Sequence, residues 1–263
     1  MLNKLMKYEL KYIFKFLAIF YSLAIFFGFL TRIFLNIENS VVFNIIGHIC
    51  SGVTISMIIN ILINNLMRLW VRFKNTFYND ESYLTHTLPV TKTTLYLSKI
   101  LVSLISIFTS VFVIFISLFI AYYSKDFMVE LKNILSTIAN LYDSSVLGFV
   151  LVLFFVFFIE FINGLQSGFT GIILGHKMNN NKIGFSVLYG FVTYTVIQTI
   201  GVITMLIVGV FNKDIMNLFF TNSPINIELF KTIMIIVIIY YFIAFVVNYI
   251  MNIKIFNKGV NVD

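Results

Sequence analysis

RLWVRFKNTFYNDESYLTHTLPVTKTTLYLSK, residues 68–99, is the longest polar interruption in a chain that otherwise consists largely of apolar runs. An apolar run lies on each side of this polar loop, at about 41–67 and about 95–123. A helix of about 20 apolar residues is long enough to cross the roughly 30 Å hydrocarbon core of a bilayer. Both runs are therefore predicted to cross a membrane, with the polar loop projecting between them.

The polar loop is predicted to contain two helices. Its first part is amphipathic at helical spacing, with an apolar face of Leu66, Leu69, Trp70, Phe73 and Phe77 and a polar face of Arg68, Arg72, Asn75 and Asn79. Asn79-Asp80 then offers a break and an N-cap for a short helix from Glu81 to Thr87. Pro89 ends that helix, and Thr91 is expected to cap the span that follows.

The composition is that of a membrane protein. The chain is 60% hydrophobic and 11% charged, with a mean hydropathy of +0.98, and a soluble domain would leave too much of that surface in water. The apolar runs are continuous instead of alternating, which excludes a β-barrel. The single cysteine, Cys50, excludes an intrachain disulfide. We predict an all-α polytopic membrane protein with one transmembrane domain over residues 1–263.

Six spans are predicted, at about 12–35, 41–67, 95–123, 146–175, 183–211 and 230–253. A basic amphipathic segment, Met1–Lys15, is expected to form an N-terminal amphipathic elbow helix at the membrane surface. A second surface helix is expected at 125–145. The apolar pieces within 213–229 either re-enter the bilayer or lie on it.

Basic residues predict the orientation of the spans. Thirteen of the 18 Lys and Arg residues lie in the N-terminal segment, the polar loop, the turn at 176–182 and the C-terminal tail. Because cytoplasmic loops are enriched in Lys and Arg, both termini and the polar loop are predicted to be cytoplasmic. The net charge of +7 is explained in this way, and no nucleic-acid partner is expected.

The fourth span carries a narrow stripe of small and polar residues at spacings that place them on one helix face: Glu160, Asn163, Gly164, Ser167, Gly168 and Gly171. Two interpretations remain open. The stripe is either a close helix-packing face that includes a GxxxG pair, or the wall of a cavity that substrate touches. A carboxylate in a span is costly unless it faces protein or water. Weaker polar stripes in other spans contain Tyr194 with Gln198, and His48.

No enzyme motif accompanies these stripes. The sequence contains no phosphate-binding glycine-lysine loop, no HExxH and no GxSxG. His48, His86 and His176 have no metal-ligand spacing. We therefore expect no catalytic residue, no metal site and no cofactor in this chain.

The segment NDESYLTHTLPVTKTTLYLSKIL, residues 79–101, resembles the first cytoplasmic loop of six-span bacterial ABC-2 type permeases. The basic amphipathic start, the six spans and the apolar loop between the last two spans are similar as well. In that family the loop carries a coupling helix that docks into a separate ATPase subunit. The resemblance implies an ATPase-contact segment of Asp80, Glu81, Tyr83, Leu84, Thr85, His86, Leu88 and Pro89. Ser82 stands where relatives often have glycine.

This resemblance implies the transmembrane subunit of an ATP-driven exporter in a bacterial cytoplasmic membrane. Its expected partners are two ATPase copies, which bind ATP and Mg²⁺, membrane lipid, and a second permease, identical or a sibling. The expected cargo is amphipathic peptides, antibiotics or lipid-like molecules, with secretion or resistance to antimicrobial peptides as the role. The alternatives are a scaffold or sensor subunit that transports nothing, and a proton-coupled secondary transporter that uses Glu160.

Overall fold

The computed structural model describes residues 1–37, 40–79, 81–141, 145–220 and 227–258. Within these ranges every regular element is an α-helix. The helices are α1 (Leu2–Leu35), α2 (Val41–Tyr78), α3 (Ser82–Thr87), α4 (Lys92–Tyr122), α5 (Lys125–Leu141), α6 (Val146–Gly175), α7 (Lys182–Phe211), α8 (Lys213–Phe220) and α9 (Ile227–Asn257). Among the described residues, six helices are long and apolar enough to cross a membrane: α1, α2, α4, α6, α7 and α9. The prediction of an all-α, multi-pass membrane protein is confirmed.

The helix boundaries follow the capping residues. Thr91 accepts a hydrogen bond from the backbone N–H of Thr94 at 3.3 Å, so it caps α4 as predicted. Ser145 caps α6 in the same way, through the backbone N–H of Gly148 at 3.1 Å. The predicted fourth span and α6 therefore share their bounds. The short helix of the polar loop is α3, which ends two residues before Pro89. Asp80, at the predicted break, lies outside the described residues.

The amino-terminal end differs from the prediction. The basic segment and the first span form one continuous helix, α1, instead of a separate elbow helix followed by a span. No proline or glycine precedes Gly28 to interrupt this helix. One face of the basic segment is also buried, at Glu9 and Ile13. Burial of this face favours continuation of the helix over a bend onto the membrane surface.

The two expected surface segments contain helices. α5 occupies most of the predicted 125–145 segment. α8 forms the first half of the 213–229 loop, which was predicted either to re-enter the bilayer or to lie on it. The second half of that loop includes residues 221–226, which lie outside the described residues.

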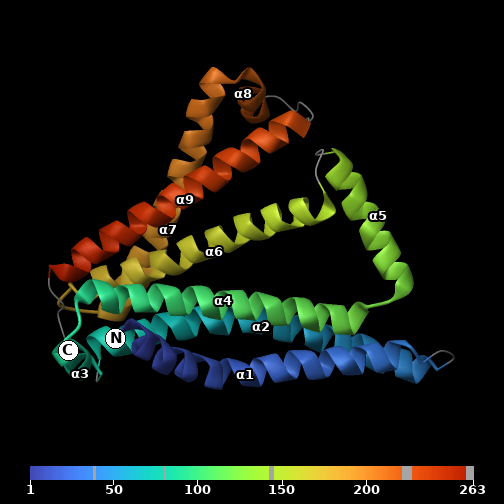
Figure 1. Ribbon diagram of the computed structural model, residues 1–263, viewed down its shortest axis with the longest axis horizontal. Helices are drawn as coiled ribbons and strands as arrows, with labels where there is room; N and C mark the ends of the chain where they lie inside the picture. Colours follow the sequence, from blue (N-terminus) through green and yellow to red (C-terminus); the bar gives the residue numbers. More distant parts are fainter. Residues whose placement is uncertain (38–39, 80, 142–144, 221–226, 259–263) are drawn as a thin grey trace. The chain divides into compact units, whose positions relative to one another are not determined.

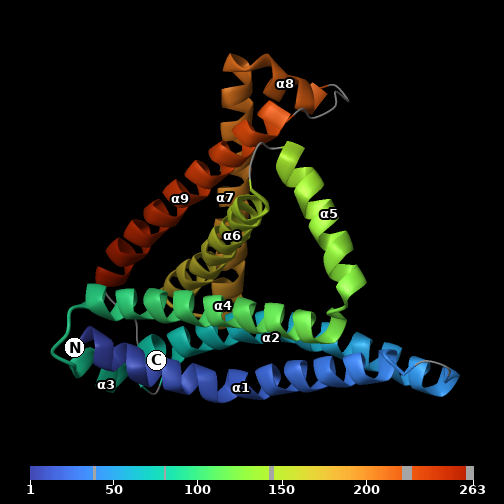
Figure 2. The ribbon, with the colours of Figure 1, turned by 45° about the vertical axis from the view of Figure 1, so that its right-hand side comes forward.

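The chain divides into two compact units, each described by itself. Unit 1 contains residues 1–75 and 86–132, and unit 2 contains residues 76–85 and 133–263. In unit 1, α1, α2 and α4 run beside one another along most of their length (Figure 1, Figure 2). Phe73, Tyr96, Ile61 and Leu17 are fully buried in this three-helix unit. α4 therefore returns along the helices that precede the polar loop.

Unit 2 is built on α6, which packs against α7 and α9. α8 follows α7 at the end where α9 begins (Figure 1). The tightest contact joins α6 to α7: a Cβ atom placed on Gly171 would lie 2.5 Å from the backbone nitrogen of Gly190 and closer still to the carbonyl oxygen of Ser186. Only glycine at position 171 allows the two backbones to come this close.

Candidate functional site

The exposed side chains of α3 form the first candidate surface. Tyr83 is 67% exposed and Leu84 is 74% exposed. Ser82 and Thr85, on the same short helix, are buried, and the hydroxyl of Thr85 donates to the carbonyl oxygen of Glu81 at 2.9 Å. α3 thus has one buried side and one exposed side with a large aromatic and a large aliphatic group.

The remaining residues of the predicted contact segment surround this surface. Leu88 and Pro89 are exposed, and Glu81 and His86 are half-buried. Asp80 is the one predicted contact residue that lies outside the described residues. The described part of the segment is therefore accessible at Tyr83, Leu84, Leu88 and Pro89.

The end of α2, which leads into α3, is anchored in unit 2. The rings of Phe77 and Phe256 meet edge to face with centroids 4.8 Å apart. The ring of Tyr78 lies 4.3 Å from the ring of His176, whose Nδ1 lies 2.9 Å from the carbonyl oxygen of Ile172. Phe77, Tyr78 and Phe256 are at most 2% exposed. These contacts hold the last turn of α2 in place within unit 2.

A polar cluster in unit 2 brings together three residues that were predicted in two separate stripes. Tyr194, on α7, lies close to the Glu160 carboxylate of α6 and to the side chain of Gln198. Tyr241, on α9, donates its hydroxyl hydrogen to Oε1 of Gln198 at 2.9 Å and lies within electrostatic range of Glu160. We call Glu160, Tyr194, Gln198 and Tyr241 the Glu160 cluster. It can hold a polar or cationic group, because it combines a carboxylate with hydroxyl and amide groups.

Tyr241 was not predicted from the sequence. The sequence feature that could have indicated this residue is the Tyr240-Tyr241 pair in the middle of an otherwise apolar span. A phenol at that depth needs a hydrogen-bond partner, and both tyrosines find one on α7: Tyr240 donates to the carbonyl oxygen of Ile197. The pair therefore ties α9 to α7.

Buried amides continue from the Glu160 cluster along the α6–α9 contact. Asn163 donates to the carbonyl oxygen of Tyr241 at 3.0 Å. Thr170 donates to Oδ1 of Asn248 at 3.0 Å. Gln166 lies between these two on α6 and is 0% exposed, and both of its amide atoms lack a hydrogen-bond partner among the described residues. Gln166, Thr170 and Asn248 were not predicted from the sequence, because none belongs to the stripe that contains Glu160.

The small residues of the predicted stripe serve mainly in packing. A Cβ on Gly164 would lie 3.8 Å from the Tyr194 ring, and the Cα of Gly168 lies 3.6 Å from a Cβ built on Gly190. Ser167 is buried and donates within its own helix, to the carbonyl oxygen of Asn163 at 2.9 Å. The tightest α6–α7 approach lies one turn beyond the predicted GxxxG pair, at Gly171 and Gly175.

His48 is not brought into the Glu160 cluster. It lies on α2, in unit 1, with its side chain exposed, whereas the other predicted path residues belong to unit 2. Gly52 belongs to the same weak stripe as His48, and a Cβ atom placed on it would have no other helix of the described chain within 4 Å. The face of α2 that carries His48 and Gly52 is therefore exposed within the described part of the chain.

A cavity of about 170 Å³ lies between α7, α8 and α9. Its wall is mostly apolar and includes Gln198 and Tyr241 of the Glu160 cluster; the lining residues are Gln198, Gly201, Val202, Met205, Phe219, Ile236, Val237, Tyr240 and Tyr241. An apolar wall next to a few polar groups is the usual lining of a small-molecule site. The cavity is large enough for one aromatic or branched aliphatic group.

Unit 1 contains a buried ionic group that the sequence did not reveal. The carboxylate of Glu9, on α1, accepts hydrogen bonds from Nε and Nη2 of Arg72 on α2, both at 3.0 Å. Nζ of Lys99, on α4, lies 2.8 Å from Oε2 of the same carboxylate. We call these three residues the Glu9 triad. Because its partners lie 63 and 90 positions away in the sequence, Glu9 was interpreted only as part of a basic surface segment.

The described residues contain no group of three or more His, Cys, Asp or Glu side chains placed to hold a metal ion. In comparisons with known proteins, no protein-family model, curated protein or solved structure matches the chain.

Proposed function

We propose that the protein is the transmembrane subunit of an ATP-driven exporter of the ABC-2 type, in a bacterial cytoplasmic membrane. The observation that carries this proposal is α3: a short helix with exposed Tyr83 and Leu84, between two long apolar helices. A permease without a nucleotide-binding motif must receive mechanical work from another chain. An exposed helix on an anchored stem is suited to that contact.

The partner of α3 in this proposal is a separate ATPase subunit with an apolar groove. Two ATPases and two permease chains, identical or siblings, form the transporter. Binding of ATP brings the ATPases together, displaces α3 and shifts the spans between two arrangements. Both termini and the polar loop face the cytoplasm, as the distribution of basic residues favours.

The proposed cargo is an amphipathic peptide, an antibiotic or a lipid-like molecule. The Glu160 cluster and the adjoining cavity support this choice, because Gln198 and Tyr241 add polar groups to a mostly apolar wall. A polar or cationic part of the cargo would contact Glu160, and an apolar part would enter the cavity.

Reconstitution tests the proposal. The chain is co-expressed with an ATPase encoded beside its gene, and the two are purified together in detergent and placed in vesicles. We expect co-purification, ATP hydrolysis that cargo stimulates, and cargo movement that requires ATP. A chain that never retains an ATPase and moves cargo without ATP would contradict the proposal.

The half-buried Glu160 supports a second candidate, a secondary transporter coupled to protons. The two candidates differ in their energy source. Transport by the second candidate responds to an imposed proton gradient in vesicles that contain no ATPase and no ATP. A scaffold or sensor subunit moves no cargo under either condition.

A further inference from the structure

Glu9 is 8% exposed at a point where the three long helices of unit 1 meet. Its two carboxylate oxygens bind the Arg72 guanidinium in a bidentate arrangement, and Oε2 also binds the Lys99 ammonium. One side chain of α1 is therefore joined to both α2 and α4. Charge-assisted bidentate contacts fix direction as well as distance.

Aromatic contacts surround the Glu9 triad. The Arg72 guanidinium carbon lies 4.3 Å from the centroid of the Tyr12 ring. Phe73 and Tyr96, which flank the triad on α2 and α4, meet edge to face at 6.1 Å, and both are 0% exposed. The triad and these rings together form a closely packed layer across α1, α2 and α4.

This layer lies close to the ends of α2 and α4 that border the polar loop. Arg72 lies six residues before the last residue of α2, Tyr78, and Lys99 lies seven residues after the first residue of α4, Lys92. At 1.5 Å per residue both stretches are about 10 Å long. Both stretches are also continuous helix, so Glu9 joins the two stems of the polar loop about two helical turns from Tyr78 and Lys92.

Stability alone does not account for a buried ionic group of this kind. Well-packed apolar residues often stabilise a protein as much as a buried ion pair does, whereas removal of one partner is strongly destabilising. What the ionic group adds is a defined register between the helices that it joins. Here that register includes α1, which is not part of the polar loop.

We propose that Glu9 is a positioning residue that fastens the amino-terminal end of α1 to both stems of the polar loop, so that α1 near Glu9, α2 near Arg72 and α4 near Lys99 move as one body. Displacement of α3 would then reach three spans together. This consequence for transport rests on the proposed function, whereas the joining of the three helices does not.

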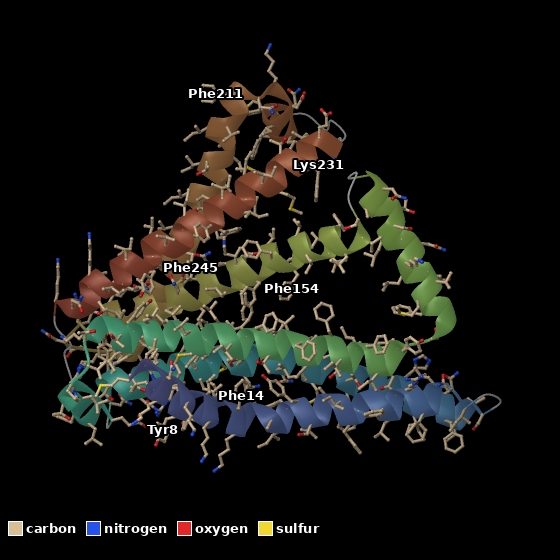
Figure 3. All side chains as sticks on the ribbon, in the orientation of Figure 1. Tyr8, Phe14, Phe154, Phe211, Lys231 and Phe245 are labelled. Atoms are coloured by element: carbon tan, nitrogen blue, oxygen red, sulfur yellow. The ribbon has the colours of Figure 1, made fainter. Side chains whose placement is uncertain are left out.

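Spin labels test the joining of the helices in the purified chain alone. Cysteines replace Tyr8, which is 72% exposed on α1 (Figure 3), and exposed Thr93 on α4, in a Cys50→Ala background. We expect one narrow distance between the labels and its loss in Glu9→Gln. Lys11→Gln, which alters an exposed charge on the same helix, is the matched control and leaves the distance narrow.

A narrow distance that persists in Glu9→Gln overturns the proposal. Where Glu9→Gln does not purify as a folded protein, Glu9→Asp is used, because the shorter side chain cannot keep both contacts. Cargo-stimulated ATP hydrolysis provides the second readout, and we expect it to be lost in Glu9→Gln while the ATPase still co-purifies. If the wild-type chain retains no ATPase, the proposed function fails, but the distance measurement still decides the role of Glu9.

Discussion

The ring of Tyr78 lies 4.3 Å from the ring of His176, with 31° between the ring planes. Tyr78 is the last residue of α2, and His176 follows the last residue of α6. This contact, together with Phe77 against Phe256, holds the last turn of α2 in place within unit 2. The end of α2 that leads toward the exposed helix α3 is therefore anchored within its unit.

The first prediction concerns the exposed side of α3. Tyr83→Ala or Leu84→Asp should release the ATPase during purification, or leave it bound with ATP hydrolysis that cargo no longer stimulates. Buried aromatic and aliphatic anchors dominate small interfaces, and loss of one costs on the order of 2 kcal/mol, which is roughly a 30-fold loss of affinity. Co-purification and cargo-stimulated ATPase activity are the measurements.

Tyr8→Ala is the matched control for Tyr83→Ala, because Tyr8 is a tyrosine of similar exposure, 72% against 67%, on another helix. This control should keep both the partner and the coupling. If the Tyr83 and Leu84 variants behave like the control, α3 is not the contact, and the ABC-2 interpretation loses the observation that carries it.

The second prediction concerns topology. Single cysteines at the exposed positions Thr93 and Asn180 should be protected from an impermeant thiol reagent in intact cells, whereas a cysteine at exposed Asn140 should react. The reason is the concentration of Lys and Arg on one side of the predicted spans. The background is Cys50→Ala, since Cys50 is the single natural cysteine. Labelling of Thr93 or Asn180 from outside would reverse the proposed orientation.

The third prediction concerns Glu160. Glu160→Gln keeps the size of the side chain and removes its charge, whereas Glu160→Leu removes both charge and hydrogen bonding. If the carboxylate binds cargo, both variants should lower export about tenfold, which corresponds to about 1.4 kcal/mol, while expression and assembly are unchanged. Glu130→Gln, at an exposed glutamate of α5, is the control and should export normally. Normal export by both Glu160 variants would leave Glu160 with a packing role.

The helices of this protein could be predicted closely, because each depends on local features. Apolar runs of membrane-spanning length, Thr91 and Ser145 as N-caps, and Pro89 beyond α3 all act within a few residues. The continuous α1 was missed for a related reason. The burial of Glu9 and Ile13, which favours the straight helix, depends on contacts with distant parts of the chain.

The candidate site was predicted only in part. Glu160, Tyr194 and Gln198 were singled out because polar groups are conspicuous in apolar spans. The pairing of Tyr241 with Gln198, and of Thr170 with Asn248, depends on how α9 lies against α6 and α7. Residues 43 and 78 positions apart carry no signal of such contacts in a single sequence.

The last prediction concerns Gln166, whose two amide atoms have no hydrogen-bond partner among the described residues. A buried amide without partners costs about 1–3 kcal/mol relative to an apolar group of the same shape. Gln166→Met keeps the length of the side chain and removes that cost, so the variant should denature at the same temperature as the wild type or a few degrees higher in detergent. Gln198→Met is the matched comparison. It leaves the Tyr241 hydroxyl without its acceptor, so it should lower the denaturation temperature.

A lower denaturation temperature for Gln166→Met would show that the amide is satisfied by bound water or lipid, and would contradict the prediction. Measurement of cargo export by Gln166→Met then tests whether the glutamine has a role in transport. If Gln166→Met is as stable as the wild type and exports cargo normally, the amide has no role in transport. If it is as stable and export falls, then Gln166 is exposed to cargo or water in another arrangement of the spans, since the arrangement described here gives its amide nothing to bind. The path of the cargo would then follow the α6–α9 contact from Asn163 toward Asn248.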